Sequence, residues 1–370
     1  MKFRLMKKVA LASLFSVVIA CGGGTTGGSS TSSYTFDYAN LLQSGALFVA
    51  IGDGVSSAAD KAGIKLKKYN NEYPSAEIAL RNTKLMVQDK PDVIIDYNAV
   101  AGIGDSIGKQ FNDAKIPCIA VNVPIKGCAW YNLVNKEIGT DTANVVIPIM
   151  KSKGWTGSDT VVILLQSAAA GTEVNDCIRY FYVTTSHAVP GFTQANPADI
   201  TAQTTKIGDS GWQLEGGGKL DSSYTAVKNA LQAIPASKHI VLYSINDDSV
   251  LGGWRAISEA HRESNSLVAG LGSDEESRNQ LRTNPQWVGE GELFPSMWGE
   301  YLMAMAVAIK KGTKAPELTK SPQVVMTKDT IDKYFKPGSD QPISLPTLAP
   351  EDQYLKDVGI LQKFNNIQGL

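Results

Sequence analysis

The chain has 370 residues, of which 35 are Lys or Arg and 36 are Asp or Glu, for a formal net charge of −1. This balance, with no basic patch in the sequence, argues against a nucleic-acid partner. A hydrophobic content of 43% and a charged content of 19% are typical of a folded globular protein. From residue 34 onward the chain is too long for one small core, so we expect two lobes.

Residues 1–20 have the organisation of an export signal. A basic start with Lys2 and Arg4 precedes the uncharged apolar run 9–20, which is shorter than the about 20 apolar residues of a spanning helix. The small Ala20 comes directly before Cys21, and the combination resembles a bacterial lipoprotein signal. We therefore expect a mature chain that begins at Cys21, carries lipid on that thiol and works in the cell envelope, tethered outside the cytoplasmic membrane. An ordinary signal peptide with an incidental cysteine is the alternative.

A linker is expected after the lipid-attachment residue, over 21–33. Its sequence from residue 22 is GGGTTGGSSTSS, which has no bulky side chain. Such a stretch behaves as a flexible coil and cannot support a packed core. The folded body therefore begins near residue 34.

Short runs rich in β-branched and aromatic residues predict strands along the body. They cover 34–40, 64–69, 92–97, 118–123, 160–166, 239–245 and 267–272. Several of these runs are apolar throughout, which is typical of strands that are covered on both faces.

Helical patterns fall between these strands. Ile103, Ile107 and Phe111 recur at helical spacing, and the segment 250–257 shows the same period. Ser296 can cap a helix over the apolar segment that ends before Gly312. Alternation of strands and helices predicts α/β units with parallel sheets, because parallel neighbours need a crossover connection. The alternation breaks at 190–219.

The cysteines leave the disulfide question open. Cys118 lies in an apolar strand-like run and is expected to be a buried thiol. Cys128 and Cys177 lie in or beside loops, so a disulfide between them is possible. The absence of a CxxC or His-rich cluster gives no indication of zinc, and no cofactor is expected.

The order of these elements carries a family resemblance. It rests on LFV at 47–49, DVIIDYNAV at 92–100, IPCIAVN at 116–122, NDDSVLG at 246–252 and FPSMWGEY at 294–301. In this order, and with the lipoprotein signal, they resemble the type I periplasmic binding proteins of the sugar-binding, ribose-binding-like branch, over roughly 34–337.

The resemblance implies an α/β fold of two Rossmann-like lobes with parallel sheets, joined by a hinge of three crossings. We expect an N-terminal lobe of 34–140 and 294–326, and a C-terminal lobe of 141–293 and 327–345. The crossings are expected near Asp141, Leu293 and Thr327. A tail, 346–370, is expected to pack on the surface.

The resemblance also implies a ligand site at the carboxyl ends of the strands, where side chains from both lobes would converge. Its candidate residues are Phe48, Tyr97, Asn98, Asn122, Trp130, Glu173, Asp176, Asn246 and Asp274. Amide and carboxyl groups can bond to neighbouring sugar hydroxyls, and aromatic rings can cover the C–H faces of a sugar. The site departs from a ribose site: Gly272 and Leu293 stand where an aspartate and an amide are expected, and the arginine expected near Asp176 is missing. We therefore expect another sugar, a polyol or a nucleoside-like molecule.

Each candidate has a structural alternative. Asn98 can form an Asx turn, and Asn246 can cap a helix. Glu173 and Asp176 lie in a first helical turn, where acidic groups favour the helix dipole. Asn122 is a strand-end amide that needs partners in any case.

Two short motifs match patterns of hydrolytic enzymes, but the sequence around each motif does not fit such an active site. The GxSxG pattern at 104–108 places Ser106 inside a helical pattern, whereas a nucleophile elbow lies directly between strand and helix. The segment 208–212 reads GDSGW, and no histidine lies in a catalytic setting. We therefore expect no enzymatic activity.

The expected function is capture of a small ligand by hinge closure and its delivery to the membrane permease of an ABC importer. A monomer that contacts the membrane through its lipid alone is expected. A receptor subunit for a sensor kinase or chemoreceptor is the alternative, and copurification with a permease or a kinase separates the two.

Overall fold

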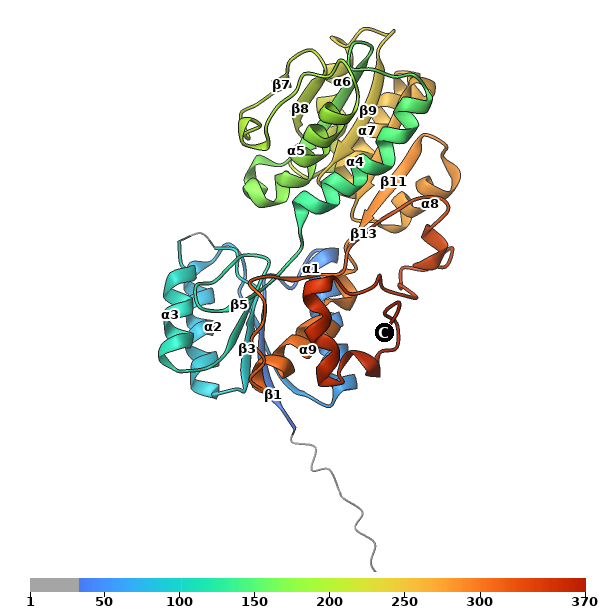
Figure 1. Cartoon of the computed structure of the whole chain (residues 1–370). Coiled ribbons are helices and arrows are strands. Elements are labelled where there is room, and N and C mark those ends of the chain that lie inside the picture. Colours follow the sequence, from blue (N-terminus) through green and yellow to red (C-terminus); the bar gives the residue numbers. More distant parts are fainter. Residues whose placement is uncertain (1–32, 101) are drawn as a thin grey trace, which may run out of the picture. The chain divides into compact units, whose positions relative to one another are not determined.

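The computed structural model describes residues 33–100 and 102–370 (Figure 1). The export signal, the lipid-attachment residue Cys21 and the linker through residue 32 lie outside the described residues, so the expectations for them stay predictions. Within the described ranges, no helix is both long and apolar enough to cross a membrane.

The first sheet, called sheet A, is parallel and has the strand order β12-β5-β4-β3-β1-β2. Its strands are β1 (Thr35–Asn40), β2 (Lys65–Asn70), β3 (Val93–Asp96), β4 (Cys118–Val121), β5 (Ala129–Asn132) and β12 (Thr319–Lys320). Its helices are α1 (Ala46–Ala62), α2 (Ala76–Asp89), α3 (Gly104–Asp113) and α9 (Trp298–Lys310). Together these elements form the N-terminal lobe.

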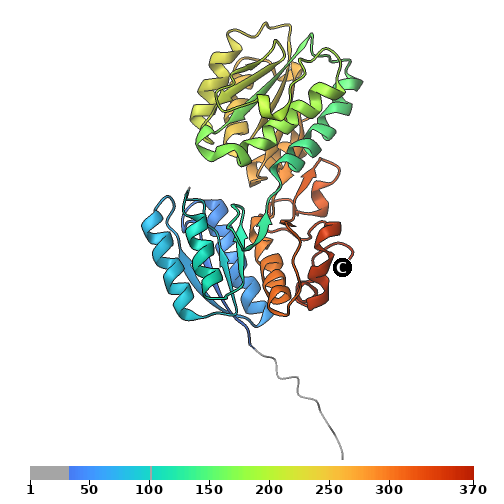
Figure 2. The ribbon, with the colours of Figure 1, turned by 60° about the vertical axis from the view of Figure 1, so that its left-hand side comes forward.

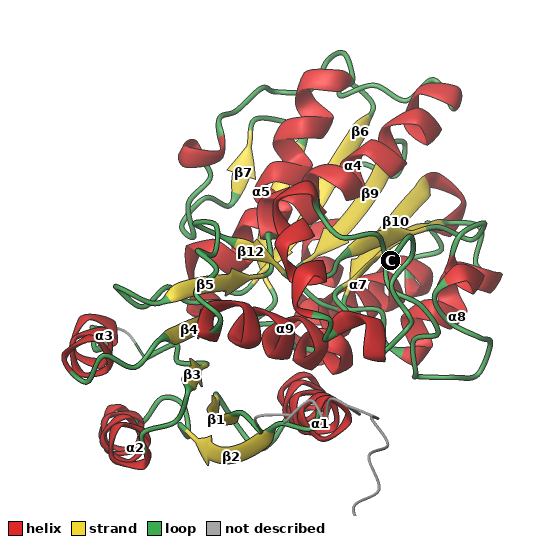
Figure 3. Ribbon diagram, turned by 60° about the horizontal axis from the view of Figure 1, so that its bottom comes forward, coloured by secondary structure: helices red, strands yellow, loops and turns green. Residues whose placement is uncertain are grey.

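Helices cover both faces of sheet A (Figure 3). Phe36 and Tyr38 of β1 pack with α1 and α9, whereas Ala39 packs with Met86 of α2 and Phe111 of α3. Because successive strand residues point to opposite faces, a strand such as β4 needs apolar residues in both alternating sets, which explains its continuous apolar sequence.

The second sheet, called sheet B, has the order β13-β11-β10-β9-β6-β8-β7 and is parallel except for the antiparallel edge strands β13 and β7. Its strands are β6 (Thr160–Gln166), β7 (Lys206–Ile207), β8 (Gly211–Glu215), β9 (His239–Ser244), β10 (Ser266–Leu271), β11 (Trp287–Glu292) and β13 (Val324–Met326). Its helices are α4 (Asn135–Ser152), α5 (Gly171–Ala188), α6 (Leu220–Leu231), α7 (Asp247–Glu259) and α8 (Glu275–Thr283). Together they form the C-terminal lobe.

Sheet B is also covered on both faces (Figure 2). Val162 and Leu164 of β6 pack in the cluster that contains α4 and α5. Val161 and Ile163 pack in the cluster that contains α6 and α7. The expected fold class, two lobes with parallel-dominated sheets and helices on both faces, is confirmed.

The chain passes between the two sheets three times. The second passage, between Glu292 and Pro295, includes the expected Leu293. The first lies between Asn132 and Asn135, before Asp141, because α4 starts directly after β5 and Asp141 is already inside this helix. The third lies between Lys320 and Val324, before Thr327, because 324–326 form an edge strand of sheet B. The lobe boundaries at 140/141 and 326/327 therefore need this adjustment.

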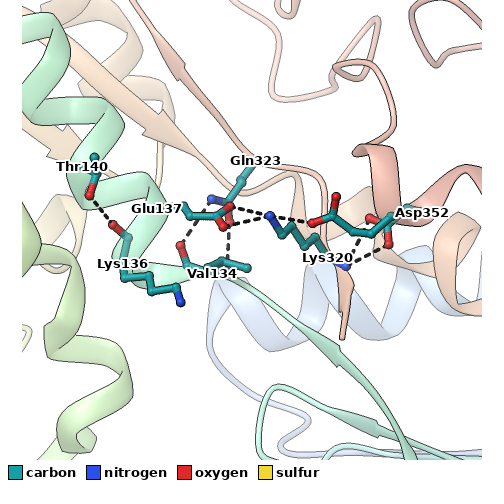
Figure 4. A network of polar contacts seen from close by, with 8 residues as sticks. Val134, Lys136, Glu137, Thr140, Lys320, Gln323 and Asp352 are labelled. Carbon is teal, nitrogen blue, oxygen red and sulfur yellow. Dashed lines mark hydrogen bonds and ion pairs between the residues drawn. The ribbon is translucent and has the colours of Figure 1, made fainter. Parts of the chain in front are cut away.

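A polar network ties the first and third passages together (Figure 4). The Val134 N–H donates to Gln323 Oε1 at 3.0 Å, and Gln323 Nε2 donates to the Val134 carbonyl oxygen at 3.3 Å. Lys320 Nζ pairs with Glu137 Oε1 of α4 at 2.8 Å and with Glu351 Oε1 of the tail at 2.7 Å. Lys320 therefore joins elements of both lobes to the C-terminal segment.

The segment 346–370 is more than a surface tail. It forms short 3-10 helices at Pro350–Val358 and Leu361–Lys363 that contact α9. Leu355 and Leu361 are fully buried in the same cluster as α9. The Pro-rich composition concealed these apolar side chains, whose spacing follows no regular helix.

The cysteine pairing differs from both expectations. Cys118 and Cys128 form a disulfide, and Cys177 is a buried free thiol in α5. Ile119 of β4 pairs with Ala129 of β5, so the residues just before each lie side by side at the starts of neighbouring strands. The sequence did not indicate this contact because β5 was not predicted as a strand.

Candidate functional site

Polar and aromatic side chains line the carboxyl edge of sheet A. Asn40 and Asn132 end β1 and β5, Tyr97 and Asn98 follow β3, and Asn122 follows β4. Since the strands are parallel neighbours, these ends meet at one edge.

Tyr97 and Asn122 form the centre of this edge. Asn122 Nδ2 donates to the Tyr97 hydroxyl at 2.8 Å, and Asn122 Oδ1 accepts from the Leu133 N–H at 3.4 Å. Burial raises the pKa of Tyr97 to about 12, although the hydrogen bond from Asn122 acts in the opposite direction. The Phe48 ring at the start of α1 is tilted against the Tyr97 ring, with 6.0 Å between centroids. The sequence-predicted Phe48, Tyr97 and Asn122 therefore lie together.

Asn98 and Trp130 support this edge through backbone contacts. Asn98 is buried, and its Oδ1 accepts from the Val100 N–H at 3.1 Å, as in an Asx turn. Trp130 Nε1 donates to the Asn122 carbonyl oxygen at 3.0 Å. Both side chains thus fix the backbone that presents Tyr97 and Asn122.

Asn40 is a residue of this edge that the sequence analysis missed. Its Nδ2 donates to the Phe48 carbonyl oxygen at 2.9 Å, and its Oδ1 accepts from the Tyr38 hydroxyl at 2.9 Å. Asn40, Phe48 and Lys68 are among the residues around a cavity of about 220 Å³. An asparagine at the end of the first predicted strand was the available indication, because it repeats the pattern seen at Asn122.

A buried carboxyl lies below the same edge. Asp96 ends β3, is 1% exposed and accepts from Asn71 Nδ2 at 2.8 Å. Burial raises the pKa of Asp96 to about 7. This group holds the loop after β2 rather than a ligand.

In the C-terminal lobe, Asn246 and Asp274 cap helices at the carboxyl edge of sheet B. Asn246 Oδ1 accepts from the Ser249 N–H at 3.1 Å and its Nδ2 donates to the Gly218 carbonyl oxygen at 2.9 Å. Asp274 Oδ1 accepts from the Ser277 N–H at 2.7 Å. Asn246 therefore has the structural role of a cap and also joins the loop before α6.

Glu173 and Asp176 lie in the first two turns of α5. Glu173 is exposed, and its Oε1 accepts from Asn132 Nδ2 of sheet A at 3.1 Å. Asp176 pairs with Arg179 Nη1 at 3.3 Å. Burial raises the pKa of Asp176, while the Arg179 charge lowers it. The expectation that no arginine lies near Asp176 is wrong, because Arg179 is one helical turn further on and only 6% exposed.

Three buried acids at the edge of sheet B were also missed. Asp247 opens α7, and Glu290 and Glu292 lie in β11. Burial raises the pKa of Glu292 to about 8, and burial together with neighbouring carboxyls raises the pKa of Asp247 and of Glu290. Their types gave no indication of burial, because isolated acids are mostly exposed.

The geometry thus yields one edge per lobe: the edge of sheet A is rich in amides and rings, and the edge of sheet B carries carboxyls and the Asn246 amide. Such groups offer hydrogen bonds to hydroxyls and apolar faces to C–H groups. Among the described residues, no group of three or more His, Cys, Asp or Glu side chains could hold a metal ion.

Comparison with solved structures identifies the fold. An ABC transporter solute-binding protein from Mycobacterium smegmatis with bound glycerol shares 17% identity and a TM-score of 0.64, over 84% of this chain and 99% of its own. An arabinose ABC transporter binding protein from Shewanella sp. ANA-3, bound to L-arabinofuranose, shares 18% identity and a TM-score of 0.62, over 80% and 93%. A periplasmic ribose ABC transporter protein from Conexibacter woesei shares 17% identity and a TM-score of 0.65, over 83% and 96%.

Sequence comparison gives the family. No curated protein matches the chain. A family model described as a periplasmic binding protein domain matches residues 38–314, which is most of the described body. The chain therefore belongs to the periplasmic binding protein domain family and has its α/β fold of two lobes.

Proposed function

We propose that this protein is an extracytoplasmic solute-binding lipoprotein that captures a small polyhydroxylated ligand, a sugar above all, between its lobes. Family membership supports work outside the cytoplasmic membrane and ligand capture rather than catalysis. The observation that carries the sugar assignment is the row of amide and aromatic groups at the edge of sheet A, centred on Tyr97 and Asn122. Solved structures of the same fold carry glycerol or arabinofuranose, by their own descriptions.

In this proposal Phe48 and Trp130 offer apolar faces, and Asn122 and Asn246 offer amides. Asn98, Glu173, Asp176 and Asp274 complete the ligand-binding set. The amides of Asn122 and Asn246 already bond to the protein, so a ligand would share or replace those bonds. The closed, loaded form would then deliver the ligand to the permease of an ABC importer.

A thermal-shift screen tests the ligand class. The body from Ser33 to Leu370 is exposed to pentoses, hexoses, polyols, nucleosides and amino acids. A ligand at 100 times its dissociation constant should stabilise the folded state by about 2.7 kcal/mol. A response to nucleosides or amino acids alone would refute the sugar assignment and leave solute binding intact.

The structure guides the choice of variants for this screen. Asn122 has a φ of 61°, so Asn122→Asp keeps a residue type that tolerates this backbone while it removes the amide donor. Asn246→Ser keeps a helix cap and removes Nδ2. Lys310→Met is the matched control. It also removes a polar contact, a 2.7 Å ion pair with Asp92, but this pair lies at the amino end of β3, away from the carboxyl edge that carries the candidate site. Loss of the sugar shift in both asparagine variants but not in the control is expected.

The lipid anchor needs its own experiment. Cys21→Ser should move the protein from the membrane fraction to the soluble envelope fraction, with no change in the folded body. A variant that stays with the membrane would contradict lipid attachment at Cys21. Copurification of the wild-type protein with a permease supports delivery to an importer, whereas copurification with a sensor kinase would favour the receptor role.

A further inference from the structure

Two buried carboxyl groups meet at strand β10 in a niche that glycines leave open. Gly270 and Gly272 are two positions apart, so both face the same side of the sheet. A Cβ atom on Gly270 would overlap the Glu290 carboxyl group, and a Cβ atom on Gly272 would overlap Asp247 Oδ2. The two acids thus occupy the space that side chains at Gly270, in β10, and Gly272, directly after it, would fill.

The two acids hold successive N–H groups of the turn after β10. Asp247 Oδ2 accepts from the Asp274 N–H at 2.9 Å, and Glu290 Oε1 accepts from the Ser273 N–H at 3.3 Å. Ser273 has a φ of 62°, a left-handed conformation that costs free energy in a residue other than glycine. These two hydrogen bonds therefore help to stabilise the conformation of the turn.

The pair has little else to neutralise it. Glu290 is fully buried and Asp247 is 8% exposed, and Asp247 Oδ1 has no hydrogen-bond partner in the part of the chain that the structure describes. Glu290 Oε2 accepts from Trp287 Nε1 at 2.8 Å, which is a neutral donor.

The charged groups around the pair are mostly acidic. Asp274 opens α8, and Glu292 lies two residues further along β11. Arg278 of α8 donates to the Ser273 carbonyl oxygen and pairs with Asp340, so its charge is shared with another carboxylate. Helix α4 faces the opposite side of β11, where Gly289 and Gly291 meet its side chains, and so it places no charge on the pair.

We propose that Asp247 and Glu290 share one proton and act as positioning residues, holding the turn 272–274 in the form that presents Asn246 and Asp274 to the ligand. Two ionised carboxylates could not both stay buried here, since each would lack a positive partner. One proton between them leaves a single charge, which the two backbone N–H groups and Trp287 can solvate. Burial and mutual repulsion raise the pKa of both acids, in agreement with this geometry. The inference rests on the proposed ligand site, although the state of the turn can be measured without a ligand.

Hydrogen exchange of the turn amides tests the shared proton in the ligand-free protein. Exchange rates are first corrected for the intrinsic exchange rate of each amide. The protection factors of the Ser273 and Asp274 amides should then fall between pH 6 and pH 9, by up to about tenfold per pH unit once the pair starts to lose its shared proton. The Gly272 amide, which donates to the Gly291 carbonyl oxygen at 2.8 Å, is the internal control and should not change.

Neutral variants of similar shape should remove this pH dependence. Glu290→Gln and, independently, Asp247→Asn each leave at most one ionisable member of the pair. Asp96→Asn, a buried acid of sheet A, is the matched control and should keep the wild-type pH dependence. The shared-proton proposal would be wrong if the protection of these amides does not change with pH in the wild type. It would also be wrong if protection falls with pH in both pair variants as it does in the wild type.

Ligand affinity then tests the positioning role. D-Ribose, L-arabinose, D-galactose and glycerol are titrated into the wild type and Glu290→Gln at pH 6 and pH 9. For each sugar that binds, the apparent dissociation constant equals the intrinsic constant divided by the fraction of molecules in which the turn is closed. Hydrogen exchange gives this closed fraction, so the wild-type affinity should fall at pH 9 by the factor that the fraction predicts, and the affinity of Glu290→Gln should stay constant. A wild-type affinity that does not follow the measured closed fraction would refute the positioning role alone. Absence of binding by the whole sugar panel would count against the proposed function and leave the exchange result standing.

Discussion

At the scale of single residues, some side chains have structural roles that cannot be inferred from the residue type alone. Asn122 adopts a left-handed backbone conformation. Its side-chain amide donates to the Tyr97 hydroxyl and accepts from the Leu133 N–H. Glycine enters this conformation readily, and among other residues asparagine and aspartate tolerate it best. The residue thus combines backbone geometry with side-chain bonding at the point where a ligand contact is proposed.

Replacement of Asn122 separates these two contributions. Asn122→Ala should lower the free energy of unfolding by about 2 kcal/mol, from backbone strain and from the unpaired Tyr97 hydroxyl. Asn122→Gly should be free of the backbone strain and should lose only the hydrogen bonds of the side chain. Urea denaturation of both variants measures the difference. Equal losses in the two variants would show that the backbone conformation contributes nothing.

At the scale of elements, close packing depends on glycines and on one disulfide. Helices α1 and α9 approach so closely that a Cβ atom on Gly54 would overlap the Ser296 carbonyl oxygen, and one on Gly299 would overlap the Gly54 carbonyl oxygen. On the other face of sheet A, the disulfide between Cys118 and Cys128 joins the starts of β4 and β5. Both features therefore fix neighbouring elements of the N-terminal lobe.

Gly54→Ala should destabilise the protein by about 1–3 kcal/mol, because the added methyl group forces α1 and α9 apart. Gly104→Ala is the matched control, since its Cβ atom would meet nothing closer than 3.8 Å. Chemical denaturation gives the comparison. A Gly54 variant as stable as the control would mean that the two helices can separate without cost.

Reduction of the disulfide should cost roughly 2–3 kcal/mol of stability, because a loop of this length loses its cross-link in the unfolded chain. Denaturation with and without a reductant measures the effect. The double variant Cys118→Ala with Cys128→Ala serves as the control and should not respond to the reductant. A response in the double variant would assign the effect to another group.

The elements also show where sequence patterns sufficed. The runs 160–166 and 239–245 predicted β6 and β9 to within one residue, because uninterrupted β-branched residues indicate a covered strand. Strand β11 was missed because its sequence, WVGEGE, alternates glycines with acids. Both acids are buried through contacts that the local pattern does not show: Glu290 fills the space beside Gly270 and accepts from the Ser273 N–H, and Glu292 accepts from the Phe294 N–H.

At the scale of the whole molecule, polar contacts join the C-terminal segment to the interlobe passages, and apolar side chains pack the same segment against α9. Lys320 pairs with Glu137 and Glu351, and its N–H donates to the Asp352 carboxylate (Figure 4). The family match ends at residue 314, so the C-terminal segment lies outside it. Lys320, Glu351 and Asp352 thus join the interlobe passages to the C-terminal segment beyond the matched residues.

Stability should fall as the pH rises from about 5 to about 8. Burial raises the pKa of Asp96, Glu300 and Asp352 to about 7 each, so the folded state binds protons that the unfolded chain releases near pH 4. Their stabilising contribution is complete below the unfolded pKa and is lost as the pH passes the folded pKa, by up to about 1.4 kcal/mol per pH unit and group. Thermal denaturation across this range measures it.

Asp96→Asn should reduce that slope, because the amide keeps the shape of the side chain and cannot ionise. Lys310→Met, which alters an exposed ion pair, should keep the wild-type slope. A variant profile at Asp96 as steep as the wild type would exclude this residue as a source of the pH dependence.

The sequence by itself determined the alternation of strands and helices, the α/β class with two parallel-dominated sheets, and the family. Local periodicity predicted the elements and their class, because it reports which faces of an element are buried, and the order of the quoted segments gave the family by resemblance. The family resemblance also singled out Phe48, Tyr97 and Asn122, and the carboxyl ends of parallel strands are where such side chains converge. Only the tertiary structure decided the partner of Cys118, the meeting of Asp247 with Glu290, and the burial of the tail around Leu355. These are contacts between distant segments, and no local pattern specifies which distant segment supplies the partner.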